Sequence, residues 1–285
     1  MRRILLGLCL LFAFNSHAFS QSTPPPAEAR ETPLSLCQAV AQRGGVIRAA
    51  ATPASSSGLQ PFEVAITYVG HSTFRVEDAT GLVAATDFAG NAGPGKVPDV
   101  VTMNHAHSTH WTPNPDPRIP YVLKGWGENG APASHHVQIG ETIIRNVTTD
   151  INSTYSGFEE NGNSIFIFEM GGLCIGHLGH LHHLLTDEHY AKIGRLDVLM
   201  VPVDGGYTLN VADMTKIVKR LNASVILPMH WFGEYSLQRF LAGVKEGFAV
   251  EVKKDTSITL SLNTLPATAT VMVLQPQTYF GIFGD

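Results

Sequence analysis

The chain has 285 residues, of which 44% are hydrophobic and 15% are charged, and its formal net charge is −5. The charged fraction lies below the usual share of about a quarter, and no segment repeats at a fixed period. A long coiled coil, a charge-driven disordered chain and a solenoid are therefore excluded. No basic patch is visible, and the pair Lys253-Lys254 is too short to count as one, so we expect no nucleic-acid partner. A chain of this length buries about 75% of its surface, which predicts a sizeable core.

The first residues have the pattern of a signal peptide that covers residues 1–18. Two arginines precede an apolar run at residues 4–14, and residues 16–18 (Ser-His-Ala) form a small-x-small cleavage site. The run is too short for a membrane span, which takes about 20 residues. We therefore expect a periplasmic or secreted protein without a stable membrane anchor.

Two cysteines remain after this cleavage, Cys37 and Cys174. An oxidising compartment permits a disulfide between them. The alternative is a pair of free cysteines, with Cys174 buried in a strand. The sequence does not fix the geometry on which a disulfide depends, so both possibilities remain open.

The mature chain divides into a lead-in at residues 19–60 and a domain at residues 61–285. Residues 19–33 are rich in Pro, Ala and Glu, which predicts a disordered segment. Residues 34–43 predict one short helix that ends before two glycines.

Within the domain, predicted strands come first and helices enter in the second half. Strands are expected at residues 64–69, 73–77, 81–86, 99–103, 142–147, 164–169, 173–175, 198–201 and 224–227. Helices are expected at residues 186–193 with Thr186 as cap, at 211–221 with one apolar face, and at 237–246. The tail from Val250 to Leu262 alternates like antiparallel strand. This order indicates an α/β fold whose chemistry lies on loops at one edge.

The first of two histidine clusters follows a predicted strand and reads His105-Ala106-His107, with His110 three residues on. In an extended segment, residues i and i+2 point to the same side, so His105 and His107 can share one metal ion. His110 can face a second ion if the loop turns. Catalytic zinc sites use such nitrogen ligands and leave one position open for water. The alternative is a polar loop that happens to hold three histidines, but HxHxxH at a strand end is a specific arrangement.

The second cluster also follows a predicted strand and contains His177, His180, His182 and His183. One ion cannot use all four imidazoles, so some of them must lie behind the ligands or face solvent. We predict His180 as a ligand and place His177 behind the ligands. The sequence leaves open whether His177, His182 and His183 touch a metal.

Other histidines stand outside these clusters. His71 follows a glycine after a strand, and His230 ends an apolar strand, where a lone histidine usually has a structural role. We expect His135 and His136 to be solvated loop residues.

Taken in order, these segments resemble the metallo-β-lactamase superfamily, and within it the ascorbate-phosphate-lactonase-like hydrolases. Residues 66–74 (ITYVGHSTF) resemble the opening strand pair, and Asp87 matches the aspartate of the first motif. Residues 105–110 (HAHSTH) resemble the HxHxDH motif, and residues 177–181 (HLGHL) resemble the segment HLGDL. His230 matches the histidine of the final motif. The resemblance covers nearly all of the mature chain.

The resemblance implies an αββα sandwich with one or two metal ions, Zn²⁺ in the first place, at the edge between the two sheets. It implies hydrolysis by metal-activated water, because a bound cation lowers the pKa of water toward about 7. The implied metal ligands are His105, His107, His110, His180 and His230. His71 and Asp87 would lie behind them, with Asp87 holding a ligand through its other ring nitrogen. The alternative for Asp87 is a turn cap.

The sequence departs from the family pattern at three positions. Thr109 replaces an aspartate, His180 replaces the aspartate that bridges two metals, and Thr149 occupies a histidine position beside the matching Asp150. Loss of the bridging carboxylate favours one ion over two. A nitrogen-rich site also suits Cu²⁺ and Ni²⁺ as well as Zn²⁺. Asp150 remains as the candidate catalytic proton acceptor.

These features predict a secreted metal-dependent hydrolase of an ester, lactone, phosphoester or amide bond in a small molecule. The alternative is a non-catalytic metal- or ligand-binding protein on the same fold, which the all-nitrogen ligand set favours. A weaker third possibility is an interaction scaffold without metal. The substrate and the oligomeric state do not follow from the sequence.

Overall fold

The computed structural model describes residues 35–38, 57–153 and 157–278. The chain divides into two units, Met1–Thr32 and Pro33–Asp285, and all described residues belong to the second. The predicted signal peptide and the predicted disordered segment lie outside the described residues, as does most of the predicted helix at residues 34–43. No helix within the described ranges is long and apolar enough to cross a membrane.

The first sheet has six strands. Their order is β13 (Ser257–Leu260), β1 (Val64–Gly70), β2 (Thr73–Asp78), β3 (Val83–Ala85), β4 (Val100–Met103) and β5 (Tyr121–Lys124). The strands from β13 to β3 pair antiparallel, whereas β3, β4 and β5 run parallel. The carboxyl ends of β3 and β4 therefore lie at the same edge of this sheet.

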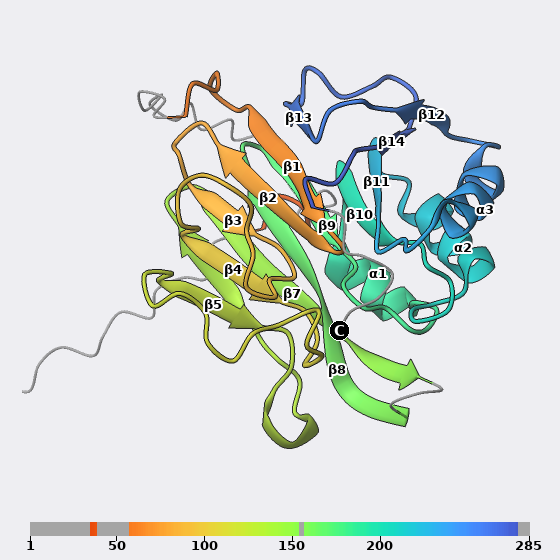
Figure 1. Ribbon diagram of the computed structural model, residues 1–285, viewed down its shortest axis with the longest axis horizontal. Helices are drawn as coiled ribbons and strands as arrows, with labels where there is room; N and C mark the ends of the chain where they lie inside the picture. Colours follow the sequence, from red (N-terminus) through yellow and green to blue (C-terminus); the bar gives the residue numbers. More distant parts are fainter. Residues whose placement is uncertain (1–34, 39–56, 154–156, 279–285) are drawn as a thin grey trace, which may run out of the picture. The chain divides into compact units, whose positions relative to one another are not determined.

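The second sheet has eight strands. Their order is β12 (Ala249–Val252), β14 (Thr270–Val273), β11 (Val225–Met229), β10 (Val198–Pro202), β9 (Leu173–His177), β8 (Gly157–Met170), β7 (Thr142–Ser153) and β6 (His136–Ile139). The strands from β12 to β9 run parallel, and those from β9 to β6 pair antiparallel. In Figure 1 the ends of β7 and β8 project beyond the sheet as an arm. A short 3-10 helix, η2 (Glu128–Gly130), precedes β6.

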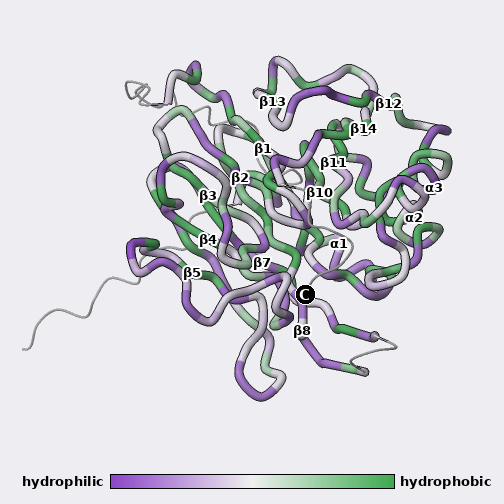
Figure 2. Tube along the Cα trace, viewed as in Figure 1, coloured by the Kyte–Doolittle hydropathy of each residue, from purple (hydrophilic) through white to green (hydrophobic). Residues whose placement is uncertain are grey.

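The two sheets pack face to face, and the period-two alternation of each strand divides its side chains between two cores. In β10, Val198 and Met200 pack between the sheets, while Leu199 and Val201 pack against the helices. Figure 2 shows the hydrophobic residues concentrated along the central strands. The outer face of the first sheet is covered by loops, with Phe88 in their core. These layers confirm the predicted α/β sandwich; in the described residues its helices lie on the eight-stranded sheet.

Two of the three helices form where the sequence signals placed them, whereas the third begins three residues earlier and ends two residues earlier than predicted. The three helices are α1 (Asp187–Ile193), α2 (Val211–Leu221) and α3 (Glu234–Val244). Thr186 caps α1 as predicted, because its side chain accepts from the backbone of His189. The apolar face of α2 is buried at Met214, Ile217 and Val218. The spacing of apolar residues with a period of 3.6 therefore predicted this helix correctly.

The prediction of antiparallel strand for the tail was wrong for β12 and is confirmed for β13. Residues 249–252 (β12) run parallel to β14 in the second sheet, whereas β13 runs antiparallel to β1 in the first. Alternation reports which face of a strand is buried and does not identify the neighbouring strand. β5, β6 and β14 were not predicted, and β7 and β8 extend over 12 and 14 residues because polar residues continue both strands into the arm. His136 begins β6, and the Nε2 atom of His135 lies 2.6 Å from the carbonyl oxygen of Lys124, so neither is a plain loop residue.

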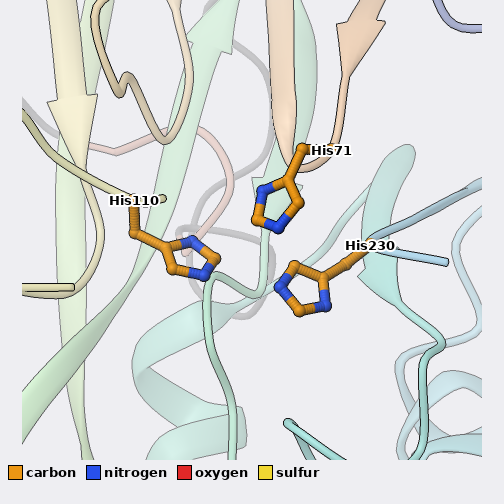
Figure 3. A group of neighbouring side chains, drawn as sticks. All are labelled: His71, His110 and His230. Carbon is orange, nitrogen blue, oxygen red and sulfur yellow. The ribbon is translucent and has the colours of Figure 1, made fainter. Parts of the chain in front are cut away.

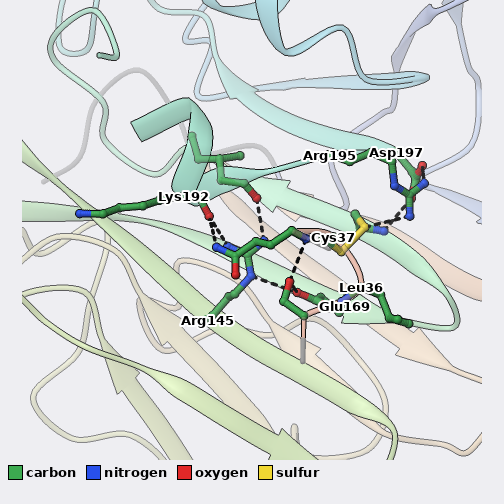
Figure 4. Close-up of a disulfide and its surroundings, with 11 residues drawn as sticks. Leu36, Cys37, Arg145, Glu169, Lys192, Arg195 and Asp197 are labelled. Carbon is green, nitrogen blue, oxygen red and sulfur yellow. Dashed lines mark hydrogen bonds and ion pairs between the residues drawn. A yellow bond between two sulfur atoms is a disulfide. The ribbon is translucent and has the colours of Figure 1, made fainter. Parts of the chain in front are cut away.

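A disulfide fastens the short described N-terminal segment to the second sheet. Cys37 bonds Cys174 of β9, with Cα atoms 5.9 Å apart. Next to it, the buried Arg145 guanidinium donates to Glu169 at 3.0 Å and to the carbonyl oxygens of residues 192 and 193. Glu169 also accepts from the Ser35 hydroxyl and from a backbone amide. We call this region, drawn in Figure 4, the disulfide corner.

Candidate metal centre

The candidate functional residues lie in loops that follow strands. His71 follows β1 and Asp87 follows β3; in the second sheet His180 follows β9, Asp204 follows β10 and His230 follows β11. Because the carboxyl ends of parallel strands meet at one edge of a sheet, these loops come together. They assemble a group that we call the histidine centre: His71, His105, His107, His110, His180, His182 and His230.

Three imidazoles lie closest to a shared point. One ring nitrogen from each of His71, His110 and His230 lies within 4.8 Å of the corresponding nitrogens of the other two. The ring centroid of His71 is 4.3 Å from that of His230 and 5.1 Å from that of His110. Figure 3 shows the three rings facing one another from three different loops.

The other predicted ligands surround this group. The ring of His180 is 4.4 Å from that of His110 and 5.4 Å from that of His105. The ring of His107 lies 6.2 Å from His105 and parallel to it. His182, whose contact with a metal the sequence left open, has its ring 4.9 Å from that of His180. The structure therefore brings together all five histidines that were predicted as ligands.

Protein groups contact the Nδ1 atoms of four of the five predicted ligands, all except His180. The distance from His110 Nδ1 to an Asp87 carboxylate oxygen is 2.6 Å, and that from His230 Nδ1 to Asp204 is 2.9 Å. His105 Nδ1 lies 2.8 Å from the Gly162 carbonyl oxygen, and His107 Nδ1 lies 3.0 Å from the Thr109 hydroxyl. Such contacts fix the tautomer and the ring orientation of metal-binding histidines and leave Nε2 as the ligand atom.

Several nitrogens in the centre are buried without a hydrogen-bond partner among the described residues. They are Nε2 of His110, Nδ1 of His180 and Nε2 of His182. Buried polar atoms nearly always have a partner, and an orphaned one costs about 1–3 kcal/mol. Three such atoms on neighbouring imidazoles fit a bound cation.

Both ring nitrogens of His177 are engaged by the backbone. Its Nε2 donates to the carbonyl oxygen of Ser72 at 2.8 Å, and its Nδ1 accepts from the Gly179 amide at 3.0 Å. Gly179 has a φ of 62°, and a Cβ atom there would lie 2.4 Å from the Asn163 side chain. That Asn163 side chain accepts from the backbone amide of His180 at 2.8 Å. His177 and Gly179 therefore position the loop that presents His180.

Three of the seven described non-glycine residues with a positive φ lie in or next to the centre. His71, Asp87 and His230 have φ values of 52°, 47° and 56°. A non-glycine residue in this left-handed region costs about 1–2 kcal/mol. Strained residues of this kind persist at functional sites because the surrounding structure determines them.

The centre favours uncharged imidazoles. Burial, with repulsion from His230 and His110, lowers the pKa of His71 to about 2. Burial and neighbouring histidines also lower the pKa values of His110 and His180 far below the usual 6.5. Burial alone would raise the pKa of Asp204, but hydrogen bonds from His230, Thr208 and a backbone amide bring it below its usual value. The neutral imidazole is the form that binds metal ions.

The structure does not bring Asp150 to these histidines. Its carboxylate accepts from the Asn161 amide at 2.8 Å, and its own amide donates to His183 at 3.1 Å. Within the described ranges, Asp150 has no hydrogen bond or ion pair with the histidine centre. Thr149 accepts from the Asn163 side chain at 2.8 Å, so this position supports the site from behind.

Asp204 is the main residue that the sequence analysis missed. One of its carboxylate oxygens holds His230, and the other accepts from the amides of Gly206 and Thr208. The available signal was the segment Asp204-Gly205-Gly206 directly after an apolar strand, since the other candidates also follow strands.

The donor set fits a divalent transition metal. All seven members of the histidine centre offer imidazole nitrogen, and the nearest carboxylates act through Nδ1 atoms. Nitrogen ligands suit Zn²⁺, Cu²⁺ and Ni²⁺, whereas Mg²⁺ and Ca²⁺ prefer oxygen. The roles of the individual residues remain predictions.

Known proteins of the same architecture support this interpretation. A UPF0173 metal-dependent hydrolase from Methanosarcina barkeri is 22% identical over 221 residues, which span 68% of this chain and 94% of the relative. A structure from Thermotoga maritima, described as a candidate zinc-dependent hydrolase of the metallo-β-lactamase superfamily, matches with a TM-score of 0.53 and 26% identity, over 74% of this chain and 100% of that one. A metallo hydrolase from Ignicoccus hospitalis shares the fold, with a TM-score of 0.50 and 18% identity over 70% of this chain and 99% of that one.

The family model described as "Beta-lactamase superfamily domain" matches residues 65–230, from the start of β1 to the last predicted ligand. The match spans more than half of the chain and includes every residue of the histidine centre. The layers of the sandwich agree with it, so the predicted metallo-β-lactamase type of fold is confirmed. The protein therefore belongs to the β-lactamase superfamily.

Proposed function

We propose that this protein is an exported metal-dependent hydrolase whose active site is the histidine centre. The observation that carries the proposal is the set of buried imidazoles with unpartnered nitrogens, each ring next to another. When bound, a divalent cation supplies Lewis acidity and a nucleophilic water at neutral pH.

The chain's own residues hold and orient this site. His105, His107, His110, His180 and His230 would provide the ligand nitrogens. Asp87 and Asp204 keep the rings of His110 and His230 in one tautomer through the Nδ1 contacts. Both carboxylates are buried, which limits their access to a substrate.

The surroundings favour an uncharged substrate with an apolar group. The exposed ring of Phe232 lies 5.0 Å from that of His230, and Tyr207 packs edge-on against Phe232 at 5.5 Å. Aromatic rings of this kind contact apolar groups and offer no charge to phosphoryl oxygens, which cationic side chains usually clamp. We therefore favour a carboxylic ester or lactone over a phosphoester.

Export rests on two separate features. The pattern at residues 1–18 is that of a cleavable signal. The disulfide between Cys37 and Cys174 suits an oxidising compartment, because cytosolic thiols are kept reduced. Together they support a periplasmic or secreted protein.

The alternative is a metal-binding protein without turnover. The observation that favours it is the set of contacts of Asp150, which engages Asn161 and His183 and leaves the centre without its predicted proton acceptor.

The test combines metal content with matched substrates. The mature protein would be purified from the periplasm without a His tag, and bound metals measured by elemental mass spectrometry. Turnover would be compared for 4-nitrophenyl butyrate, dihydrocoumarin and bis(4-nitrophenyl) phosphate, beside a His105→Ala/His107→Ala control. Bound metal with ester or lactone hydrolysis, both reduced in the control, supports the proposal. Bound copper without turnover supports the binding alternative, and absence of metal after reconstitution overturns both.

A further inference from the structure

His71 occupies an unexpected place in the histidine centre. It belongs to the turn between β1 and β2, far in sequence from the HxHxxH segment, and the sequence analysis placed it behind the ligands. In the structure its ring is instead a neighbour of both His110 and His230, at 5.1 Å and 4.3 Å between centroids. Figure 3 shows its ring turned toward the rings of His110 and His230.

Hydrogen bonds hold His71 in this position. Its carbonyl oxygen accepts from the Tyr68 hydroxyl and from the His230 amide, both at 2.7 Å. Its Nδ1 lies 2.9 Å from the Ser72 hydroxyl, and one of its ring nitrogens lies within 4.8 Å of ring nitrogens of His110 and His230. His71 has a positive φ of 52°. The bond from its carbonyl oxygen to the His230 amide also fixes the backbone of His230. His71 and His230 are therefore positioned relative to each other by a direct backbone bond.

Thr109 does not supply a ligand in this region. It stands where the family resemblance implied an aspartate, and its hydroxyl contacts Nδ1 of His107 on an exposed stretch. The aspartate that the resemblance implied at this position is therefore absent from the donor set. The ring of His71 lies beside His110 and His230, and one of its nitrogens is within 4.8 Å of theirs.

We propose that His71 is a metal ligand and forms a three-imidazole site with His110 and His230 in place of the lost carboxylate. The inference rests on the metal binding in the proposed function and does not depend on hydrolysis. It makes this ligand set uncharged, because the two nearby carboxylates, Asp87 and Asp204, act only through Nδ1 atoms. Such a set suits late first-row metals and disfavours Mn²⁺ relative to Zn²⁺ or Co²⁺.

The experiment uses His71→Asn, because asparagine tolerates a positive φ better than most residues. Co²⁺ would be titrated into metal-free mature protein, and its visible absorption would report the coordination. Affinity for Zn²⁺ would come from chelator competition. His230→Asn serves as the reference for loss of a ligand, and His136→Asn as the control for an exposed histidine outside the centre.

We expect His71→Asn to weaken Zn²⁺ at least about tenfold and to change the Co²⁺ absorption as His230→Asn does, while His136→Asn changes neither. An unchanged Co²⁺ spectrum in a folded His71→Asn protein that still binds Co²⁺ would overturn the proposal. If the variant does not fold, the wild-type protein decides: a crystal structure with Zn²⁺ must show a ring nitrogen of His71 at about 2.0–2.1 Å from the ion. A longer distance, or failure of the wild type to bind Zn²⁺ or Co²⁺, counts against it. Metal binding without ester hydrolysis would remove the proposed function and keep the ligand assignment.

Discussion

The disulfide corner and the histidine centre both join distant parts of the chain through buried polar groups, but they satisfy those groups differently. At the disulfide corner, the Arg145 guanidinium donates hydrogen bonds to Glu169 and to two backbone carbonyl oxygens. The Glu169 carboxylate also accepts from the Ser35 hydroxyl and from a backbone amide. In the histidine centre, protein acceptors satisfy only one side of the rings, and nitrogens of His110, His180 and His182 are left without partners.

This difference separates a structural site from a binding site. A closed network such as that of Arg145 stabilises one arrangement of the chain and offers nothing to a ligand. The histidine centre retains backbone strain at His71 and His230 and has orphaned nitrogens, both of which are unfavourable without a bound partner. We infer that the first region serves stability and the second serves chemistry, and substitutions in the two regions can separate these roles.

Replacement of His230 by asparagine should have the largest effect on function. Asparagine accepts the positive φ of 56° at this position and keeps an amide that can donate to Asp204. We expect loss of bound metal and a fall in kcat/KM of about a thousandfold or more, because a metal ligand is part of a unit that acts together. Elemental mass spectrometry and ester hydrolysis measure both. Retained metal and activity would show that the centre is not the active site.

Removal of the disulfide should lower the stability of the protein and leave its bound metal unchanged. Cys37→Ser/Cys174→Ser opens a cross-link between residues 137 positions apart, and a long closed loop predicts a loss of about 2–5 kcal/mol of unfolding free energy. Thermal unfolding should therefore shift down by roughly 5–15 °C. Metal stoichiometry at 25 °C should stay unchanged. A variant that unfolds normally but loses metal would contradict the separation of the two regions.

Substitution of Asp204 by asparagine should weaken metal binding by about 10–100-fold, since it alters the acceptor that orients His230 without removing a ligand. The matched variant is Asp197→Asn at the disulfide corner, where the carboxylate accepts from the amide of Cys174 and from Arg195. That change should lower stability and leave Zn²⁺ affinity as in the wild type. Chelator competition and chemical unfolding on both variants test the pair, and equal losses of Zn²⁺ affinity would refute it.

Much of the fold could be predicted from the sequence, and the reasons are visible in particular elements. Helix α2 has an apolar face of period 3.6, and its observed bounds, Val211–Leu221, equal those predicted. The pairing of the strands was harder to predict, because the sequences of β12 and β13 show the same alternation although the two strands join different sheets. The arm formed by β7 and β8 was underestimated, since it is held by cross-strand pairing along polar residues.

The candidate site, like the fold, could be predicted from the sequence only in part. Histidines that follow strands were predictable as a group, because parallel strands bring their carboxyl ends to one edge. The inward direction of the His71 side chain could not be predicted, since it depends on a positive φ and on contacts to Tyr68 and His230. The prediction of Asp150 as proton acceptor rested on its resemblance to a motif position. A β-bulge lies between Thr149 and Ile151, and Asp150 contacts Asn161 and His183 there.

The metal-free protein should lose stability on acidification because of the histidine centre. The folded-state pKa of His71 is lowered to about 2, and those of His110 and His180 are also lowered. In the unfolded chain these groups bind protons below about pH 6.5, so the stabilisation is present above that pH and is lost as the pH falls toward 2. Between pH 7 and pH 5.5 we expect a decrease of about 1–3 kcal/mol in unfolding free energy. Urea unfolding at both values should show a shallower dependence for His71→Asn, and a pH-independent midpoint would exclude buried neutral imidazoles.

The smallest expected effect concerns the substrate. Phe232 is exposed beside His230, whereas Phe158 is an exposed aromatic residue on the arm and has no described ring contact with the histidine centre. If Phe232 supports the apolar part of an ester, Phe232→Ala should raise KM for 4-nitrophenyl butyrate by about 5–10-fold, a loss of about 1–1.4 kcal/mol in binding. KM for 4-nitrophenyl acetate should rise less, because the acetyl group has fewer apolar atoms to lose contact. Phe158→Ala should change neither value, and metal content should be equal in all three proteins. Equal effects of Phe232→Ala on both esters would mean that the ring shapes the histidine centre and does not select the acyl group.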